Sequence, residues 1–150
     1  MYLNCAFSGH RNLNDYKFDY LKLDRVIENL MKDGVKNFYC GMAVGFDLAC
    51  AESVLQFKDK YGAKLIACVP CPTQAEKFTQ NSKDRYYSVL DKCDEIITVS
   101  DSYRLGCMHE RDRLLVDRCD VLVCFLKKKS GGTYYTVNYA KSQNKEIIYL

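Results

Sequence analysis

Several features that would assign this chain of 150 residues to a class of protein are missing. No apolar run approaches the roughly 20 residues that a membrane-spanning helix needs, so no membrane partner is expected. The first residues, MYLNCAFSGHR, lack a basic region followed by a long apolar stretch, which argues against a secretory signal. We therefore expect a cytoplasmic protein.

Neither a strong charge nor a set of metal ligands is present. The net charge of +3 at pH 7 gives no support for a coat of nucleic acid, so we expect no direct nucleic-acid binding. A zinc site built on the C-x-x-C pair, Cys68 and Cys71, would need a second pair or well-spaced histidines. His10 and His109 are the only histidines. We therefore expect no metal and no cofactor.

The cysteine count argues against a disulfide framework. Nine is an odd number, and most of these residues lie in apolar stretches, where a reduced cysteine behaves as a small hydrophobe. A redox pair would normally open a helix, whereas Pro70 and Pro72 bracket Cys71. Structural cysteines are the favoured interpretation, and a redox role for the C-x-x-C pair stays open.

Familiar nucleotide and hydrolase motifs are also absent. The turn GMAVG lacks the lysine and the hydroxyl of the triphosphate-binding P-loop. It does not fit G-x-G-x-x-G either, so a dinucleotide-dependent reductase has no direct support. No Ser-His-Asp set occurs in the setting that a serine hydrolase requires.

The chain does contain a regular alternation of apolar strands and helical segments. Apolar residues make up 48% and charged residues 27%, as in globular proteins, and no linker or repeat divides residues 1–150, so we expect one domain. Strands are predicted at 2–7, 35–40, 63–69, 95–99, 121–126 and 146–150, and helices at 19–33, 46–60, about 82–90, 108–118 and 134–142. This order predicts an α/β, Rossmann-like, open and mainly parallel sheet of five to six strands with helices on both faces.

Three glycine turns follow strands of this predicted sheet. They are FSGHR at 7–11, GMAVGFD at 41–47 and the Gly-Gly-Thr turn at 131–133. The carboxyl ends of parallel strands share one edge, where ligands bind in such folds. Unpaired N–H groups and the helix dipole attract phosphate at a turn that opens a helix. The sequence therefore predicts a composite site for a phosphorylated ligand.

Charged residues near these turns have two interpretations each. Arg11 could grip a phosphate with two hydrogen bonds, or pair with an acid at the surface. Asp47 could accept hydrogen bonds from ribose hydroxyls, or complement the dipole of the helix that it begins. Glu52 is more simply a partner for a basic neighbour. The lysines at 127–129 form either a solvated loop or an attractive field for phosphate.

The motifs GMAVGFDLACAE, MHERDRLLVDRCD and GGTYYT, in this order, resemble the SLOG superfamily. This Rossmann-like group includes the cytokinin-activating LOG enzymes and the DNA-processing Smf/DprA proteins. The resemblance is to its small YpsA/YoqJ-type branch of bacterial and prophage proteins, and it also covers FSGHR and PCPTQAEKF. It implies a nucleotide or nucleotide-derived ligand at the glycine turns, and it allows a homodimer or larger homo-oligomer.

The resemblance also implies which residues touch that ligand, with Phe78 belonging to the same motif in a less defined role. The expected contacts are Ser8, Gly9, His10, Arg11, Gly41, Met42, Ala43, Gly45, Asp47, Gln74, Arg111, Gly131, Gly132, Thr133 and Thr136. LOG-type phosphoribohydrolases carry a catalytic glutamate at the position of Thr136, and Asp112 replaces a lysine that often follows the family arginine. Thr136 cannot act as a carboxylate base, so Asp47 and Glu52 are the remaining catalytic candidates.

Three functions follow from these observations. The first is a non-hydrolytic sensor or binding protein for a nucleotide-derived ligand of phosphoribosyl or ADP-ribose type. The alternative is a phosphoribohydrolase or N-glycosidase that processes nucleotides. The third is an interaction protein whose pocket has decayed. The retained glycines argue against decay, because each costs about 0.5–1 kcal/mol where regular structure could form instead.

Overall fold

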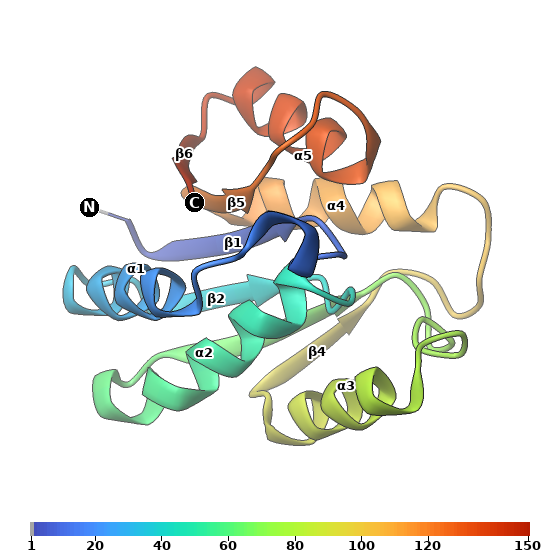
Figure 1. The fold of residues 1–150 in the computed structure, drawn as a ribbon, viewed down its shortest axis with the longest axis horizontal. Helices are drawn as coiled ribbons and strands as arrows, with labels where there is room; N and C mark the ends of the chain where they lie inside the picture. The colour runs from blue at the N-terminus through green and yellow to red at the C-terminus, as the bar shows by residue number, and fades with distance from the viewer. Residues whose placement is uncertain (1) are drawn as a thin grey trace.

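The computed structural model describes residues 2–150 and consists of a parallel sheet with helices on both faces (Figure 1). The strands are β1 (Asn4–Gly9), β2 (Asn37–Cys40), β3 (Lys64–Val69), β4 (Glu95–Thr98), β5 (Val121–Phe125) and β6 (Glu146–Tyr149). The helices are α1 (Tyr20–Lys32), α2 (Phe46–Tyr61), α3 (Gln80–Lys92), α4 (Cys107–Arg118) and α5 (Gly131–Ser142), with a short 3-10 helix at Asn14–Tyr16. The predicted α/β fold and each predicted strand and helix are confirmed.

The order of the strands places a switch point beside β1. The sheet reads β4-β3-β2-β1-β5-β6, and each neighbouring pair is parallel. The chain moves outward from β1 through β2 and β3 to β4, and then returns through α4 to place β5 on the other side of β1 (Figure 1). The loops that leave β1 and β5 therefore diverge to opposite faces, which opens a crevice at the carboxyl edge.

Both faces of the sheet are covered, which explains the nearly continuous apolar strands. Alternate residues of β1 illustrate this. Cys5 and Phe7 belong to the core cluster that includes residues of α1, α2 and α3, while Ala6 belongs to the cluster that includes residues of α4 and α5. The helices end within two residues of the predicted bounds. Helix α2, predicted to end at 60, ends at Tyr61, and Gly62 closes it in a left-handed conformation (φ 65°). Within residues 2–150, no helix combines the length and hydrophobicity needed to cross a bilayer.

Two element boundaries differ from the prediction at the carboxyl edge. Strand β1 extends to Gly9, because its pairing with β5 continues to the register Gly9↔Phe125. Helix α5 begins at Gly131, so the Gly-Gly-Thr segment forms its first turn and does not precede it. The positive φ of Gly131 (89°) allows the chain to enter the helix directly from the lysine-rich loop.

The cysteines are free thiols, and eight of the nine are buried. Both members of the C-x-x-C pair lie inside, and burial raises the pKa of Cys68 to about 12. A thiol in this environment stays protonated at neutral pH, and the protonated form is a poor nucleophile.

Candidate functional site

A cavity of about 510 Å³ opens at the switch point, between the loops that follow β1 and β5. Its wall comes from segments far apart in the sequence: the end of β1, the loop before α2, the start of α4 and the first turns of α5. Its lining includes Ser8, Gly9, His10, Arg11, Ala43, Asp47, Arg111, Lys128, Gly131, Gly132, Thr133 and Thr136. Two of the glycine turns and part of the third thus meet at one place.

The loops after β1 and β2 are locked together by glycines. A Cβ atom on Gly9 would overlap the buried ring of Phe46, and one on Gly45 would overlap the backbone carbonyl of Arg11. Gly45 also has φ 80°, a conformation that side-chain-bearing residues rarely adopt. The N–H of Phe46 donates to the carbonyl of His10 over 3.1 Å. These glycines therefore permit loop-on-loop packing.

A buried polar cluster lies behind the cavity, centred on the carbonyl of Gly41. This carbonyl accepts hydrogen bonds from the guanidinium of Arg111 and from Nε2 of Gln74, the latter over 2.9 Å. The Oε1 of Gln74 in turn accepts from the hydroxyl of Tyr86 over 3.1 Å. Arg111 is only 5% exposed, and its Nε donates to Asp112 over 2.8 Å. The cluster ties α3 and α4 to the end of β2.

Asp47 lies beside this cluster and lines the cavity. Its Oδ2 accepts a hydrogen bond from the N–H of Ala43 over 3.2 Å. Burial raises the pKa of Asp47 from 3.8 to about 7, because the nearby charge of Arg111 only partly offsets the loss of hydration. This carboxyl therefore changes its charge close to neutral pH, as a general acid or base requires.

His10 connects the two sides of the switch point. Its Nε2 accepts a hydrogen bond from the backbone N–H of Lys127 over 2.8 Å, so this nitrogen carries no proton and Nδ1 does. Burial lowers the pKa of His10, and the charges of Lys128 and Lys127 lower it further. His10 is thus held neutral and fixes the position of the loop after β5.

The first turn of α5 is open, unlike the glycine turns after β1 and β2. Ser130, the residue before the helix, makes no side-chain capping bond, and nothing lies within 4 Å of a Cβ built on Gly131 or Gly132. Thr136 is buried, and its hydroxyl donates to the carbonyl of Gly132 over 2.9 Å. The helix therefore offers its free N–H groups to the cavity.

Two cations at the cavity have no acidic partner among the ion pairs of residues 2–150. Arg11 and Lys128 are both exposed, and each lines the cavity. In the same part of the chain, histidine, cysteine and acidic side chains form no group of three that could hold a metal ion. The arrangement suits a small anion held by cations and backbone amides.

Four of the fifteen expected contact residues lie outside this cavity. Gly45 and Gln74 line a neighbouring cavity, while Gly41 and Met42 are buried and line neither. Met42 adopts a positive φ of 64° behind the loop. Glu52, the other acid considered, also lines neither cavity: it binds Arg85 through two hydrogen bonds of 3.0 and 2.5 Å.

The sequence did not single out Asp15, Tyr16 or Met108, although all three line the cavity. Asp15 and Tyr16 belong to the short 3-10 helix, for which the sequence carries no periodic signal. Met108 is the second residue of α4 and comes close only because the chain crosses back at the switch point. Long-range topology, not a local motif, places these residues.

A model of the YpsA family, described as the YspA SLOG family, matches residues 8–149. The chain belongs to the YpsA family. This YpsA-family chain is also 30% identical over 134 residues to the uncharacterized SPbeta prophage-derived protein YoqJ of Bacillus subtilis, covering 80% of the chain and 78% of that protein. The resemblance inferred from the motifs is thereby confirmed.

Two solved structures share the fold of this YpsA-family chain. DNA processing protein A from Helicobacter pylori, solved for its single-stranded DNA binding mode, has a TM-score of 0.71 at 20% identity, with 98% of this chain covered. DNA processing protein A from Streptococcus pneumoniae has a TM-score of 0.72 at 17% identity, with 99% covered. The chain spans only 64% and 50% of those two proteins.

This likeness corrects one expectation. The small net charge led us to expect no direct nucleic-acid binding, and that exclusion is wrong because a protein of the same fold binds single-stranded DNA. Net charge averages over the whole surface, whereas binding depends on local cations. Arg11 and Lys128 provide such cations at the switch point of this YpsA-family chain.

Proposed function

We propose that this YpsA-family protein binds a nucleotide or nucleotide-derived ligand, of phosphoribosyl or ADP-ribose type, in the switch-point cavity and acts as a sensor or binding protein. One observation carries the proposal: the uncapped first turn of α5 faces a cavity lined by Arg11 and Lys128, two cations that take part in no ion pair within residues 2–150. Free N–H groups and cations together favour a phosphate.

We also propose a cytoplasmic location and a single domain. The free thiols support a reducing, cytoplasmic location, and the unbroken sheet supports one domain over residues 1–150.

Binding without turnover is the favoured version because the structure offers no carboxylate at the position of Thr136. The hydroxyl of Thr136 is already bonded to the carbonyl of Gly132, so its proton is engaged within the helix. A hydroxyl in that state cannot stabilise a developing ribosyl cation as a carboxylate would.

The test is calorimetric titration of the protein with AMP and ADP-ribose, followed by the same titration of Arg11→Ala. Loss of a charge-assisted hydrogen bond is worth about 1.5–3 kcal/mol, so we expect the affinity to fall at least about tenfold. Arg25→Ala is the matched control, since Arg25 is exposed on α1 and lines neither the switch-point cavity nor its neighbour. Equal affinities of Arg11→Ala and the parent protein would remove the phosphate role.

An enzymatic function is the second candidate, and Asp47 is the observation that favours it. Its carboxyl reaches the cavity and has a pKa raised to about 7 by burial, which suits proton transfer. Incubation with nucleoside monophosphates would then release free base, and Asp47→Asn would abolish the release. Glu52→Gln serves as the control because Glu52 pairs with Arg85 outside the cavity.

Single-stranded DNA is a third ligand to test by calorimetric titration, because the chain shares its fold with DNA processing protein A. The backbone of DNA offers the same phosphate chemistry to Arg11 and to the start of α5. Its binding would weaken steeply with added salt in proportion to the phosphates contacted, whereas a mononucleotide would respond less.

A further inference from the structure

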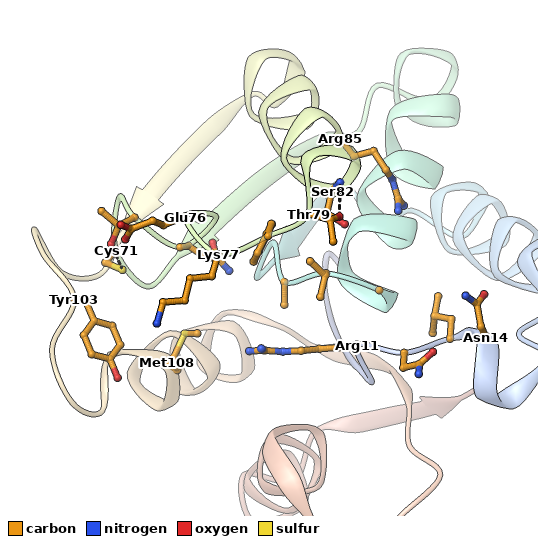
Figure 2. Close-up of a pocket in the computed structure, with 18 of the residues that line it drawn as sticks. Arg11, Asn14, Cys71, Glu76, Lys77, Thr79, Ser82, Arg85, Tyr103 and Met108 are labelled. Atoms are coloured by element: carbon orange, nitrogen blue, oxygen red, sulfur yellow. Dashed lines mark hydrogen bonds between the residues drawn. The ribbon is translucent and has the colours of Figure 1, made fainter.

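A second cavity of about 800 Å³ adjoins the switch-point cavity (Figure 2). It lies beside α3 and the loop that leads into α4, and it has no part in the function proposed above. Arg11, Asn12, Ala43 and Met108 line both cavities, so the two are chambers that meet at these residues. In Figure 2 the side chains of Arg11 and Lys77 both extend toward Met108 at this meeting point.

The second chamber has a different chemistry from the first. Aromatic rings of Tyr20, Phe78 and Tyr103 line it, together with the hydroxyl groups of Thr79 and Ser82 and the side-chain amide of Asn14. Tyr103 is 65% exposed at the mouth. Planar rings and adaptable hydrogen-bonding groups suit a nucleobase and its sugar, because every base has a face that stacks on an aromatic side chain.

The charges are concentrated where the chambers meet. Arg85 also lines the second chamber, but its guanidinium is bound to Glu52 through two hydrogen bonds. Among the ion pairs of residues 2–150, Lys77 and Arg11 have no acidic partner. Glu76 also lines the second chamber, and Arg11 is a cation that lines both chambers. Arg11 and Lys77 therefore place positive charge between a chamber suited to phosphate and a chamber suited to a base.

We infer that the second chamber binds the second nucleoside of a ligand in which two nucleosides are joined through phosphate. This inference rests on the proposed function, because the first chamber holds the terminal phosphate. Lys77 contacts the linking phosphate, Arg11 contacts the terminal phosphate from the place where the chambers meet, and Tyr103 stacks on the second base. A soluble dinucleotide and a stretch of single-stranded DNA share this chemistry.

The experiment compares the affinities of three probes: dAMP, the 5′-phosphorylated dinucleotide of deoxyadenosine, and a longer oligodeoxyadenylate. We expect the dinucleotide to bind at least about tenfold more tightly than dAMP, as one stacked base contributes. Tyr103→Ala and Lys77→Ala should each remove most of this gain and leave the affinity for dAMP unchanged. Tyr2→Ala and Lys32→Ala are matched controls, since both residues lie outside the two cavities.

The outcomes separate the two proposals. If dAMP binds and the dinucleotide binds no better, or if Tyr103→Ala and Lys77→Ala leave the gain intact, the second chamber is no nucleoside site. If no probe binds at all, the proposed function fails first. A longer oligodeoxyadenylate offers several overlapping dinucleotide positions, which raises its apparent affinity in proportion to their number. If its affinity exceeds that of the dinucleotide by more than this factor, the ligand is single-stranded DNA. If it does not, the ligand is a soluble dinucleotide.

Discussion

The glycine turns at the carboxyl edge look alike in the sequence and differ in the structure. Around Gly9, Gly41 and Gly45 the space of a side chain is already filled by Phe46, by Arg111 with Asp47, and by the backbone of Arg11. Around Gly131 and Gly132 nothing lies within 4 Å. The glycines of the first group allow other parts of the protein to pack closely against the backbone. The glycines of the second group leave open space beside the cavity.

This difference divides the site into a rigid part and an accessible part. The loops after β1 and β2 are held by packing, by the bond from Phe46 to His10 and by the buried Arg111. The first turn of α5 offers its free backbone N–H groups to the cavity, beside Thr133. A ligand that enters meets donors whose positions are already fixed, which lowers the entropic cost of binding.

Removal of Arg111 should have the largest effect on the rigid part. Arg111→Met leaves the carbonyl of Gly41 without its guanidinium donor and leaves Asp47 without its nearest positive charge. Loss of one partner from a buried charged cluster costs about 3–5 kcal/mol. We expect the free energy of unfolding, measured with urea, to fall by that amount.

The control for this change is Arg118→Met, at the exposed end of α4. An exposed arginine contributes little, so we expect its stability to stay within about 0.5 kcal/mol of the parent protein. Comparable losses for Arg111→Met and Arg118→Met would show that the buried cluster does not stabilise the rigid part.

Substitution of Gly45 tests the loop-on-loop packing directly. Gly45→Ala places a Cβ against the carbonyl of Arg11 at a positive φ. Overpacking costs about 1–3 kcal/mol and the backbone conformation about 1–2 kcal/mol, so we expect a loss of ~3 kcal/mol in unfolding free energy. Gly62→Ala is the matched control, because Gly62 has φ 65° with open space around it. If both variants lose only about 1 kcal/mol, packing against Arg11 is not what requires glycine at position 45.

The pH dependence of stability should also originate in the rigid part. The pKa of Asp47 is raised by burial from 3.8 to about 7, so the folded state binds this proton more tightly than the unfolded state does. The resulting stabilisation is complete below pH 4 and is lost as the pH rises to about 7. We expect the decline between these values to be steeper in the parent protein than in Asp47→Asn, as measured by urea unfolding at several pH values. Parallel curves for the two proteins would place the pKa of Asp47 near its ordinary value.

The fold could be predicted because its signals are local. Apolar runs and helix periodicity specify the elements one at a time. The parallel sheet then follows from the alternation of strand and helix. The boundary at α5 was missed because glycines predict a turn, whereas Gly131 and Gly132 here form the first helical turn.

The site was less predictable because it depends on contacts between distant segments. The sequence does not distinguish a glycine that packs against Phe46 from a glycine that lies beside a cavity. Arg111 was expected to contact the ligand, but its burial against the carbonyl of Gly41 depends on how α4 crosses the sheet. Tyr20 and Tyr103 carried no motif. They line the second chamber together only because the fold brings the start of α1 close to the loop before α4.

Substitution of a glycine in the accessible part should leave stability intact and weaken ligand binding, in contrast to substitution of Gly45 in the rigid part. Gly132→Ala adds a methyl group in open space within a helix, where alanine is favoured over glycine by about 0.5–1 kcal/mol, so we expect the free energy of unfolding to stay equal or rise by up to that amount. The same methyl group projects beside the cavity, so the affinity for AMP should fall even though the fold is intact. Measuring the free energy of unfolding and the affinity for AMP on the same variant therefore tests whether the accessible part differs from the rigid part. If Gly132→Ala unfolds as easily as Gly45→Ala, or if it leaves the affinity for AMP unchanged, the first turn of α5 is not an open surface kept for a ligand.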